Sequence, residues 1–395
     1  MTASLVRPGD HLSSRAAPPD ESRRLKIAMF CHNYVPHPGG LEVMVQNLSR
    51  GLAARHDVVL VTSDWPGASG ASREEGMTVH RLPASHAAER RGVPYPVPTG
   101  RGLLAAMRAA RGADIVHAHG ALYAQTMLAA RTARLSNAPL VITEHVGFVQ
   151  YKRAMINAVE RAAWKLVGDR TVRRAAALTT YNARVKTWLE SRYARPVHYI
   201  GNGVEFERFR PRPLEERWAL RRQLGLPEHE VLVLFVGRAS EKKNLDAVLA
   251  MPREGWTLVV CGAERGLRGD RIVDLGILPH AKMPDLFAAA DVMVNPSTGE
   301  GFPLAIQEAV AAGVPLVLLW DEGYDGWLPR EAVAACDGIG GVQPAVRALV
   351  ASPEARARLS RAGRDWAVRR WSWDATVNAY EELYRDRLHD YTRAR

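Results

Sequence analysis

Two glutamates stand eight residues apart where a loop is expected to run into a helix. Glu300 lies between Gly299 and Gly301, and Glu308 lies in the predicted helix, within the stretch 296–313. The glycines let the backbone approach a ligand closely, and carboxylates accept hydrogen bonds from groups such as sugar hydroxyls. Spacing alone favours a simpler alternative, in which one glutamate is a loop-surface charge and the other an exposed helix residue.

The start of this predicted helix is suited to an anion. Pro303 fits the first turn of a helix, where a missing N–H is harmless. Free amides and the helix dipole favour a negative group at this end, and a diphosphate would satisfy both. The amides concerned are those around Gly301, Phe302 and Leu304. The stretch therefore predicts a phosphate-cradling loop that leads into a helix.

Three cations follow the apolar run 231–236, which predicts a buried strand. They are Arg238, Lys242 and Lys243. Arginine can hold a diphosphate with its planar fork, and lysine can do so as a point charge. A solvent-exposed turn is the alternative for such a short run of charges.

Histidines mark the ends of two further predicted strands. His117 and His119 end the strand predicted over 115–119, and Glu144 and His145 follow the strand predicted over 140–143. Ligands of parallel sheets sit beyond the carboxyl ends of the strands. His117 and His119 share one face of their strand, and His119 is nearer the loop. For each histidine, a structural role is the alternative.

Short β-rich runs alternate with helical segments along the chain. This alternation predicts an α/β protein with doubly wound parallel sheets. The first unit is a strand within 25–34, a turn at Gly39 and Gly40, and a helix over 41–54; its loop lacks the GxGxxG pattern. A plain tight turn would also explain the two glycines. Further strands are expected at 58–62, 78–82, 115–119, 140–143, 177–180, 231–236, 256–261, 291–295 and 314–319.

Size and composition bound the class of protein. The chain has 395 residues, for which two domains are the default expectation, and its formal charge of +11 attracts anionic partners. Its three cysteines, Cys31, Cys261 and Cys336, are far apart, which favours a reducing cytoplasm and argues against a structural zinc site. No apolar run has the length that a membrane span needs.

The segment 148–176 is strongly basic and is predicted to be helical. Its cations alternate with apolar side chains. Such a helix could lie on an anionic membrane or guide an anionic acceptor. A solvated helix with its apolar side on the domain core explains the same pattern. We therefore expect a cytoplasmic protein. Peripheral contact of this protein with the inner face of the membrane is left open as an alternative.

Several motifs occur together and in order over most of residues 25–388. The E-x7-E pair is Glu300 and Glu308, the VGR motif ends at Arg238 and is followed by Lys243, and an NGV segment begins at Asn202. The set resembles the retaining, nucleotide-sugar-dependent glycosyltransferases of family GT4. This resemblance implies the GT-B fold, in which two Rossmann-like domains face a cleft.

The resemblance also implies a division of the chain. A disordered tail would occupy residues 1–24 and an acceptor-side domain residues 25–203. A domain that binds the nucleotide sugar would follow at 204–370, and a C-terminal helix at 371–395 would return to the first domain. The implied enzyme is a hexosyltransferase of carbohydrate biosynthesis, acting on a glycan, a lipid-linked acceptor or a small molecule.

The family pattern assigns roles to residues of the second domain. Arg238 and Lys243 would hold the diphosphate, with Lys242 as the alternative lysine. The amides at Gly301, Phe302 and Leu304 would add to the phosphate site. Two carboxylates complete the donor site, with Glu308 on the ribose and Glu300 on the sugar.

In the first domain, the resemblance places His119 beside the donor sugar and Gly39 and Gly40 near the donor phosphate and the acceptor. Front-face substitution would need no cofactor and no metal, in agreement with the absence of a DxD motif near a strand end. Two departures from the pattern are Glu205 in place of an aspartate and residues 321–324 in place of a Gly-Gly loop.

Two other functions remain open. A nucleotide-sugar epimerase or hydrolase could share the two-domain architecture. A basic protein that binds nucleic acid is a different class, but the sequence contains no zinc finger and no aromatic motif of an RNA-binding sheet. We therefore expect no nucleic-acid partner.

Overall fold

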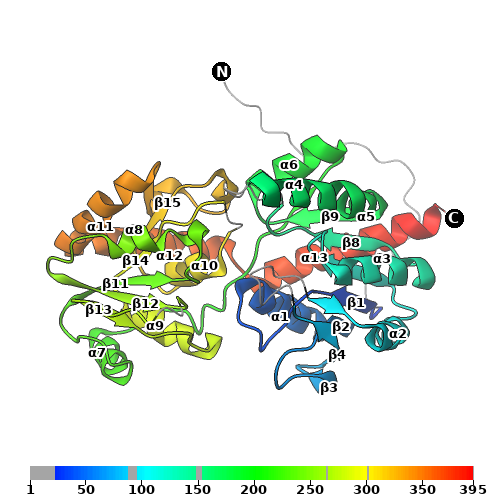
Figure 1. Cartoon of the computed structure of the whole chain (residues 1–395), viewed down its shortest axis with the longest axis horizontal. Helices are drawn as coiled ribbons and strands as arrows, with labels where there is room; N and C mark the ends of the chain where they lie inside the picture. Colours follow the sequence, from blue (N-terminus) through cyan, green and yellow to red (C-terminus); the bar gives the residue numbers. More distant parts are fainter. Residues whose placement is uncertain (1–22, 88–95, 148–153, 264–265, 300–301, 395) are drawn as a thin grey trace.

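The computed structural model describes residues 23–87, 96–147, 154–263, 266–299 and 302–394. Each of two sheets is flanked by helices, and the two α/β units lie side by side (Figure 1). The predicted α/β fold with doubly wound parallel sheets is confirmed. Most of the tail expected at 1–24 lies outside the described residues.

The first sheet has eight strands in the order β10-β9-β8-β7-β1-β2-β4-β3. It is parallel except for its edge strand β3, so the expectation of a wholly parallel sheet is wrong there. Glu75 and Gly76 both have positive φ, 47° and 84°, and they form the two-residue turn of an antiparallel β3–β4 hairpin. The strands are β1 Lys26–Phe30, β2 Asp57–Ser63, β3 Gly70–Glu74, β4 Met77–Leu82, β7 Ile115–His119, β8 Leu140–Thr143, β9 Ala177–Thr180 and β10 His198–Tyr199.

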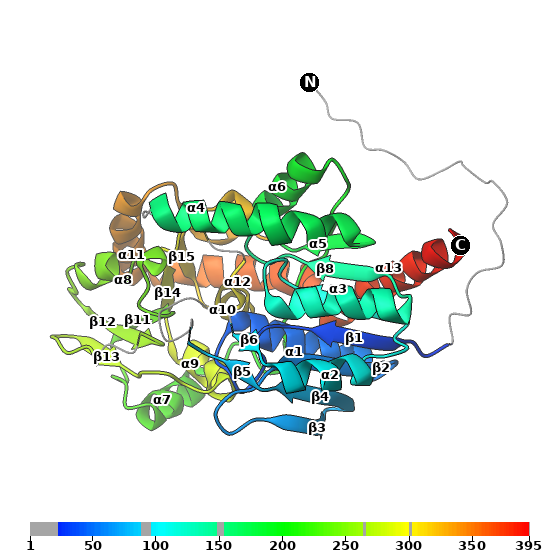
Figure 2. The same cartoon turned by 45° about the vertical axis from the view of Figure 1, so that its right-hand side comes forward.

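Helices cover both faces of this sheet (Figures 1 and 2). In α1, Leu48 and Leu52 are fully buried and recur at the helical period, which is the pattern of a helix packed on a sheet. The helices are α1 Gly40–Ala53, α2 Gly100–Ala109, α3 Ala124–Ser136, α4 Ala154–Ala163, α5 Asp169–Arg174 and α6 Ala183–Tyr193, and the π-helical turn η2 Trp164–Gly168 joins α4 to α5. A small separate hairpin pairs β5 Ala84–Ser85 with β6 Val97–Pro98.

The second sheet is parallel throughout, in the order β13-β12-β11-β14-β15-β16. Its central strands are continuous apolar runs, as expected for strands covered on both faces. The strands are β11 Val231–Val236, β12 Trp256–Cys261, β13 Ile272–Asp274, β14 Val292–Asn295, β15 Leu316–Leu319 and β16 Ala334–Cys336; the α-helices are α7 Leu214–Gln223, α8 Leu245–Leu249, α9 Met283–Ala289, α10 Leu304–Ala311, α11 Val342–Ala351 and α12 Pro353–Arg370.

The chain crosses between the sheets beside its own C-terminal helix, α13 Trp373–Arg393. A Cβ at Gly203 would collide with the backbone of Trp373, so the glycine permits this close approach. Glu205, the departure from the family pattern, accepts a hydrogen bond from Arg50 of α1 at 2.7 Å. From there α13 packs along α1 and reaches the first sheet (Figure 2).

Two expected helices have different limits. The sequence of residues 345–362 predicts one helical region, but the structure divides it into α11 and α12 at Ser352. The Ser352 hydroxyl accepts a hydrogen bond from the Ala355 amide and caps α12. The basic segment expected as one helix is α4, η2 and α5, and its first residues, 148–153, lie outside the described residues. No helix in the described ranges is long and apolar enough to cross a membrane.

Candidate active site

The N-termini of two helices, one from each domain, meet between the sheets. A Cβ at Gly40, the first residue of α1, would stand 3.4 Å from the Cβ of Leu304, the first residue of α10. Helix N-termini present unpaired amides and a partial positive charge. The junction therefore combines two ends that favour an anion. Pro303 lies one position before α10, as its N-cap, and not within the first turn.

The cationic loop of the second domain is joined to the chain that enters α10. The Thr298 amide donates a hydrogen bond of 2.9 Å to the carbonyl oxygen of Lys242. The Asn244 side-chain amide donates one of 2.8 Å to the carbonyl oxygen of Pro296. These two bonds hold the loop after β11 and the loop after β14 against each other, at neighbouring carboxyl ends of the sheet.

Within the cationic loop, Lys243 is positioned by a glycine. Gly237 has φ 156°, and a Cβ there would stand 3.1 Å from Cδ and Cε of Lys243. The lysine stem thus lies over the glycine and is half-buried, whereas Arg238 is exposed at the end of β11. The glycine of the VGR motif supplies the space that the lysine stem occupies.

Of the loop residues expected to contact a donor, Glu300 and Gly301 lie outside the described residues. Phe302 is buried, with its ring 5.5 Å from that of Tyr324 and 5.6 Å from that of Trp371. The side chain of Leu304 is also buried. These two residues therefore have only backbone groups to offer a ligand, as the phosphate interpretation requires.

Glu308 is buried in α10, so the alternative of an exposed helix residue is wrong. Its Oε1 lies 2.5 Å from Nε2 of His280, a half-buried residue of the turn before α9. Burial raises the pKa of the Glu308 carboxyl, and the contact with His280 opposes this increase. The sequence did not suggest this pair, because 28 residues separate its members.

In the first domain, His119 belongs to a row of buried rings at the end of β7 and β8. Its Nδ1 lies 3.2 Å from Nε2 of His145, whose Nδ1 lies 3.1 Å from the Tyr181 hydroxyl. Among the described residues, Nε2 of His119 has no hydrogen-bond partner. Burial holds the pKa of His119 well below its usual value, so the ring is neutral and keeps one nitrogen for a ligand.

His117 and Glu144 have structural contacts. His117 lies 2.7 Å from the Thr143 hydroxyl and accepts or donates a second 2.7 Å hydrogen bond with Tyr384 of α13. Glu144 accepts hydrogen bonds from the amides of residues 121, 145, 146 and 147, which fix the loops after β7 and β8. These residues hold the strand ends in place.

Gly39 faces a carboxylate that the sequence reasoning missed. A Cβ at Gly39 would collide with Oε2 of Glu42, whose Oε1 lies 2.7 Å from Nδ1 of His37. Burial disfavours the Glu42 charge, but the contact with His37 and the nearby His32 lower its pKa overall. The side chain of Glu42 fills the space over this glycine. A carboxylate in the first turn after two glycines was the available signal.

The residues that replace the expected Gly-Gly loop lie against the first domain. Asp321 accepts a hydrogen bond of 2.7 Å from the Gly323 amide and caps a short 3₁₀ turn, η5 Glu322–Tyr324. A Cβ at Gly323 would collide with the side-chain amide of Asn182, which caps α6 in the first domain. This turn is therefore part of the contact between the domains.

Fold and site together define a class, the GT-B glycosyltransferases. Sucrose-phosphate synthase from Thermosynechococcus elongatus is similar in structure, with TM-score 0.75 and 20% identity over 92% of this chain and 99% of that one. Anabaena Alr3699/HepE in complex with UDP-glucose has TM-score 0.71 and 16% identity over 91% of this chain and 99% of that one. These likenesses establish the fold.

Sequence relatives narrow the class. The D-inositol 3-phosphate glycosyltransferase of Salinispora arenicola is 30% identical over 331 residues, 72% of this chain and 71% of that protein. The GDP-mannose-dependent alpha-mannosyltransferase of Mycolicibacterium smegmatis is 29% identical over 387 residues, 91% of this chain and 98% of that protein. The model of Glycosyltransferase Family 4 matches residues 38–208, and that of Glycosyl transferases group 1 matches residues 216–366.

The chain belongs to the group 1 glycosyltransferases, with a family 4 N-terminal domain. It is a glycosyltransferase, as the E-x7-E, VGR and NGV motifs predicted.

Proposed function

We propose that this enzyme transfers a sugar from a nucleoside-diphosphate sugar to an acceptor hydroxyl with retention of the anomeric configuration. The observation that carries the proposal is the pair of hydrogen bonds that joins the Arg238–Lys243 loop to the entry of α10. It keeps cations, helix amides and the buried Glu308 at one end of one sheet. In this proposal, residues 25–203 hold the acceptor and 204–370 the donor, with 371–395 returning to the first domain.

The diphosphate is the group that this loop fits best. Lys243 supplies a positioned point charge, Arg238 supplies a planar fork, and the amides at the start of α10 point toward the same ligand. Charge builds on the diphosphate as the bond to the sugar breaks. Preorganised positive groups stabilise that charge without reorganisation, so they lower the barrier to transfer.

Two glutamates are proposed to bind hydroxyl groups. Glu308 accepts hydrogen bonds from the ribose hydroxyls, because its buried carboxylate has few other hydrogen-bond donors within reach. His280 orients the Glu308 carboxylate. Glu300 takes the donor sugar, a role that rests on the E-x7-E resemblance alone.

In the proposed transfer step, the bond between the anomeric carbon and the diphosphate oxygen breaks while the acceptor oxygen attacks from the same face. The acceptor proton passes to the leaving phosphate oxygen, so no enzyme nucleophile is required. His119, neutral and with Nε2 available, hydrogen-bonds the sugar. Gly40 gives the start of α1 its close approach to Leu304 of the other domain, and Gly39 precedes it near the proposed donor phosphate and acceptor. In this proposal, the transfer reaction needs neither a cofactor nor a metal ion.

The relatives and neighbours suggest where to search for substrates. One relative is named for GDP-mannose, another for D-inositol 3-phosphate, and one solved neighbour contains UDP-glucose. We propose a hexose donor and test UDP-, GDP- and ADP-sugars with an inositol phosphate, a disaccharide and a lipid-linked acceptor.

We also propose a cytoplasmic location with peripheral contact at an anionic membrane surface. The support is the basic surface of η2 and α5, with exposed Lys165, Arg170, Arg173 and Arg174. Cationic side chains beside exposed apolar ones are attracted to anionic lipid surfaces.

The anomeric configuration of the product tests the transfer mechanism. We expect the product formed from an α-linked donor to have an α-glycosidic bond, as measured by the one-bond coupling of the anomeric carbon in NMR. A β-linked first product would overturn front-face substitution. Formation of free sugar with the same rate in the presence and absence of every acceptor would support hydrolysis instead.

A further inference from the structure

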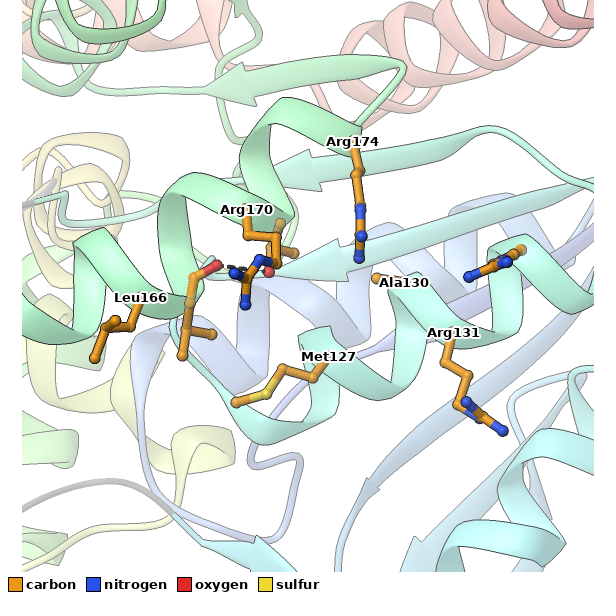
Figure 3. Close-up of a pocket in the computed structure, with 9 residues that line it drawn as sticks. Met127, Ala130, Arg131, Leu166, Arg170 and Arg174 are labelled. Atoms are coloured by element: carbon orange, nitrogen blue, oxygen red, sulfur yellow. Dashed lines mark hydrogen bonds between the residues drawn. The ribbon is translucent and has the colours of Figure 1, made fainter.

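A pocket opens on the outer surface of the first domain, between α3 and the η2–α5 segment. Its volume is about 290 Å³. Arg131 and Arg134 of α3 line one wall, and Arg170 and Arg174 of α5 line the other. In Figure 3, Arg170 and Arg174 lie on the α5 side, and the side chain of Arg131 extends away from them on the α3 side. We call this feature the arginine pocket.

The four guanidinium groups of the arginine pocket form no ion pair within the part of the chain that the structure describes. No carboxylate lines the pocket. The adjacent Asp169 is engaged elsewhere, because it accepts hydrogen bonds from Arg192 at 2.9 and 3.0 Å and from Tyr193 at 2.7 Å. Positive charge on both walls of a pocket that no carboxylate lines favours an anion that neutralises it.

Exposed apolar side chains stand beside these cations at helical spacing. Met127, Arg131 and Leu135 recur every four residues along α3, and Met127 and Leu135 are 46% and 61% exposed. Leu166, 66% exposed, begins the matching row that continues with Arg170. A soluble phosphate ligand would require the cations but would give no reason for these apolar side chains.

The pocket also lies near the strand end that carries His119. The start of α3 is fixed to that edge of the sheet by two contacts: the Thr126 hydroxyl donates to the carbonyl oxygen of Gly120, and the Gln125 side chain donates to that of His32 at 3.4 Å. Met127 is the next residue of the same helix turn. A surface bound at the arginine pocket would therefore lie beside the first domain's part of the candidate active site.

We propose that the arginine pocket binds the phosphate headgroup of an anionic phospholipid, with Met127, Leu135 and Leu166 inserted at the acyl boundary. Guanidinium groups bind phosphate with bidentate geometry, and each cation near an anionic surface adds a factor of roughly five to partitioning. The inference rests on the membrane contact proposed above and gives that contact a defined site.

The test is sedimentation of the protein with vesicles of phosphatidylcholine alone or with 30 mol% phosphatidylglycerol, at low salt. We expect the native protein to bind the anionic vesicles only. The variant R131Q/R134Q/R170Q/R174Q should bind them at least tenfold more weakly. The matched control R347Q/R358Q/R361Q/R369Q changes the same charge on exposed arginines of α11 and α12 and should bind within about twofold of the native protein.

Equal loss in both quadruple variants would overturn the proposal, because it would reduce binding to net charge. The apolar part is tested by Leu166→Ser, with exposed Leu214→Ser of α7 as the control. We expect weaker vesicle binding from L166S alone. If inorganic phosphate raises the melting temperature through the four arginines while L166S binds vesicles normally, the site takes soluble anions and the lipid proposal fails.

Donor binding separates this inference from the proposed function. The arginine-pocket variant should keep the increase in melting temperature that a nucleotide sugar produces in the native protein. A variant that loses vesicle binding but keeps donor binding supports both proposals. If no nucleotide sugar raises the melting temperature of the native protein, that result counts against the proposed function. The vesicle-binding result then still stands as the test of the arginine pocket.

Discussion

At the scale of single residues, Lys243 is the side chain whose proposed role, binding the diphosphate, is tested most sharply by substitution. Replacing it with alanine removes a charge that is positioned over Gly237 for the diphosphate. We expect Lys243→Ala to reduce kcat/KM by about 10²–10³-fold, the usual effect of losing one stabilising group in a transition state. Steady-state kinetics with the best donor would measure it.

The neighbouring Lys242→Ala is the matched control for that variant. The contact that Lys242 makes with Thr298 uses its backbone carbonyl, which alanine retains. We expect less than a tenfold loss. The opposite ranking, with Lys242→Ala the more damaging, would transfer the phosphate role to Lys242.

Glu308 is expected to lower the stability of the folded protein at pH 7 while it contributes to donor binding. Burial raises its pKa, so the folded protein holds this proton at pH values where the unfolded chain has released it. Stability from this group is therefore full below the unfolded pKa and is lost as pH rises toward the higher folded pKa. We expect Glu308→Gln to raise the melting temperature at pH 7 and to abolish the donor-dependent increase.

Calorimetry at pH 7 with and without donor separates the two effects in Glu308→Gln. Glutamine keeps the shape of the side chain, and His280, half-exposed, can return to water. A variant that is less stable than the native protein and still binds donor would contradict both the pKa direction and the ribose assignment.

Little of this residue-level detail was available from sequence. The E-x7-E and VGR patterns identified the positions that came to lie at one end of the second sheet. The pairs Glu308–His280 and Glu42–His37 form only when distant or looping segments meet, and no local pattern encodes their geometry. The alternatives left open for Glu308 were decided by its burial alone.

At the scale of elements, buried histidines at the ends of β7 and β8 make the folding stability depend on pH. Burial lowers the pKa of both His117 and His145 to about 3. The unfolded chain binds these protons near pH 6.5 and the folded domain does not, so stability falls as pH decreases from 6.5 toward 3. Each histidine contributes on the order of 1.4 kcal/mol per pH unit in this window.

Urea unfolding at pH 7, 6 and 5 measures this dependence. We expect His117→Gln to reduce the slope by about one proton, and exposed His229→Gln in the second domain to leave it unchanged. Because Tyr384 of α13 bonds to His117, the loss should include release of the C-terminal helix from the first sheet. An unchanged slope in His117→Gln would contradict a neutral buried ring.

The elements themselves were largely predictable. Buried parallel strands are continuous apolar runs, and the strands at 115–119 and 140–143 were placed without error. The edge strand β3 was missed because its sequence, GASRE, is polar and mostly exposed. The break between α11 and α12 was missed although Ser352 and Pro353 form a recognisable helix start.

At the scale of the whole molecule, the C-terminal helix connects the two domains. Residues 371–376 contact the crossing segment, where the Val204 amide donates to the carbonyl oxygen of Trp371 at 3.0 Å. The Thr376 hydroxyl donates to the carbonyl oxygen of Gly201 at 2.8 Å. The two segments that connect the domains, 201–204 and 371–376, thus run side by side. The start of α10 lies opposite the start of α1. This arrangement places the proposed donor and acceptor halves of the site at one junction.

The central claim is that the second domain binds a nucleotide sugar through the loop at Arg238–Lys243 and the start of α10. Thermal unfolding with a panel of UDP-, GDP- and ADP-sugars tests it most directly, because a ligand that binds only the folded state raises stability by mass action. We predict that sugars of one nucleotide raise the melting temperature of the native protein and of Lys242→Ala but not that of Lys243→Ala. No increase with any donor, or an equal increase in all three proteins, would contradict the account.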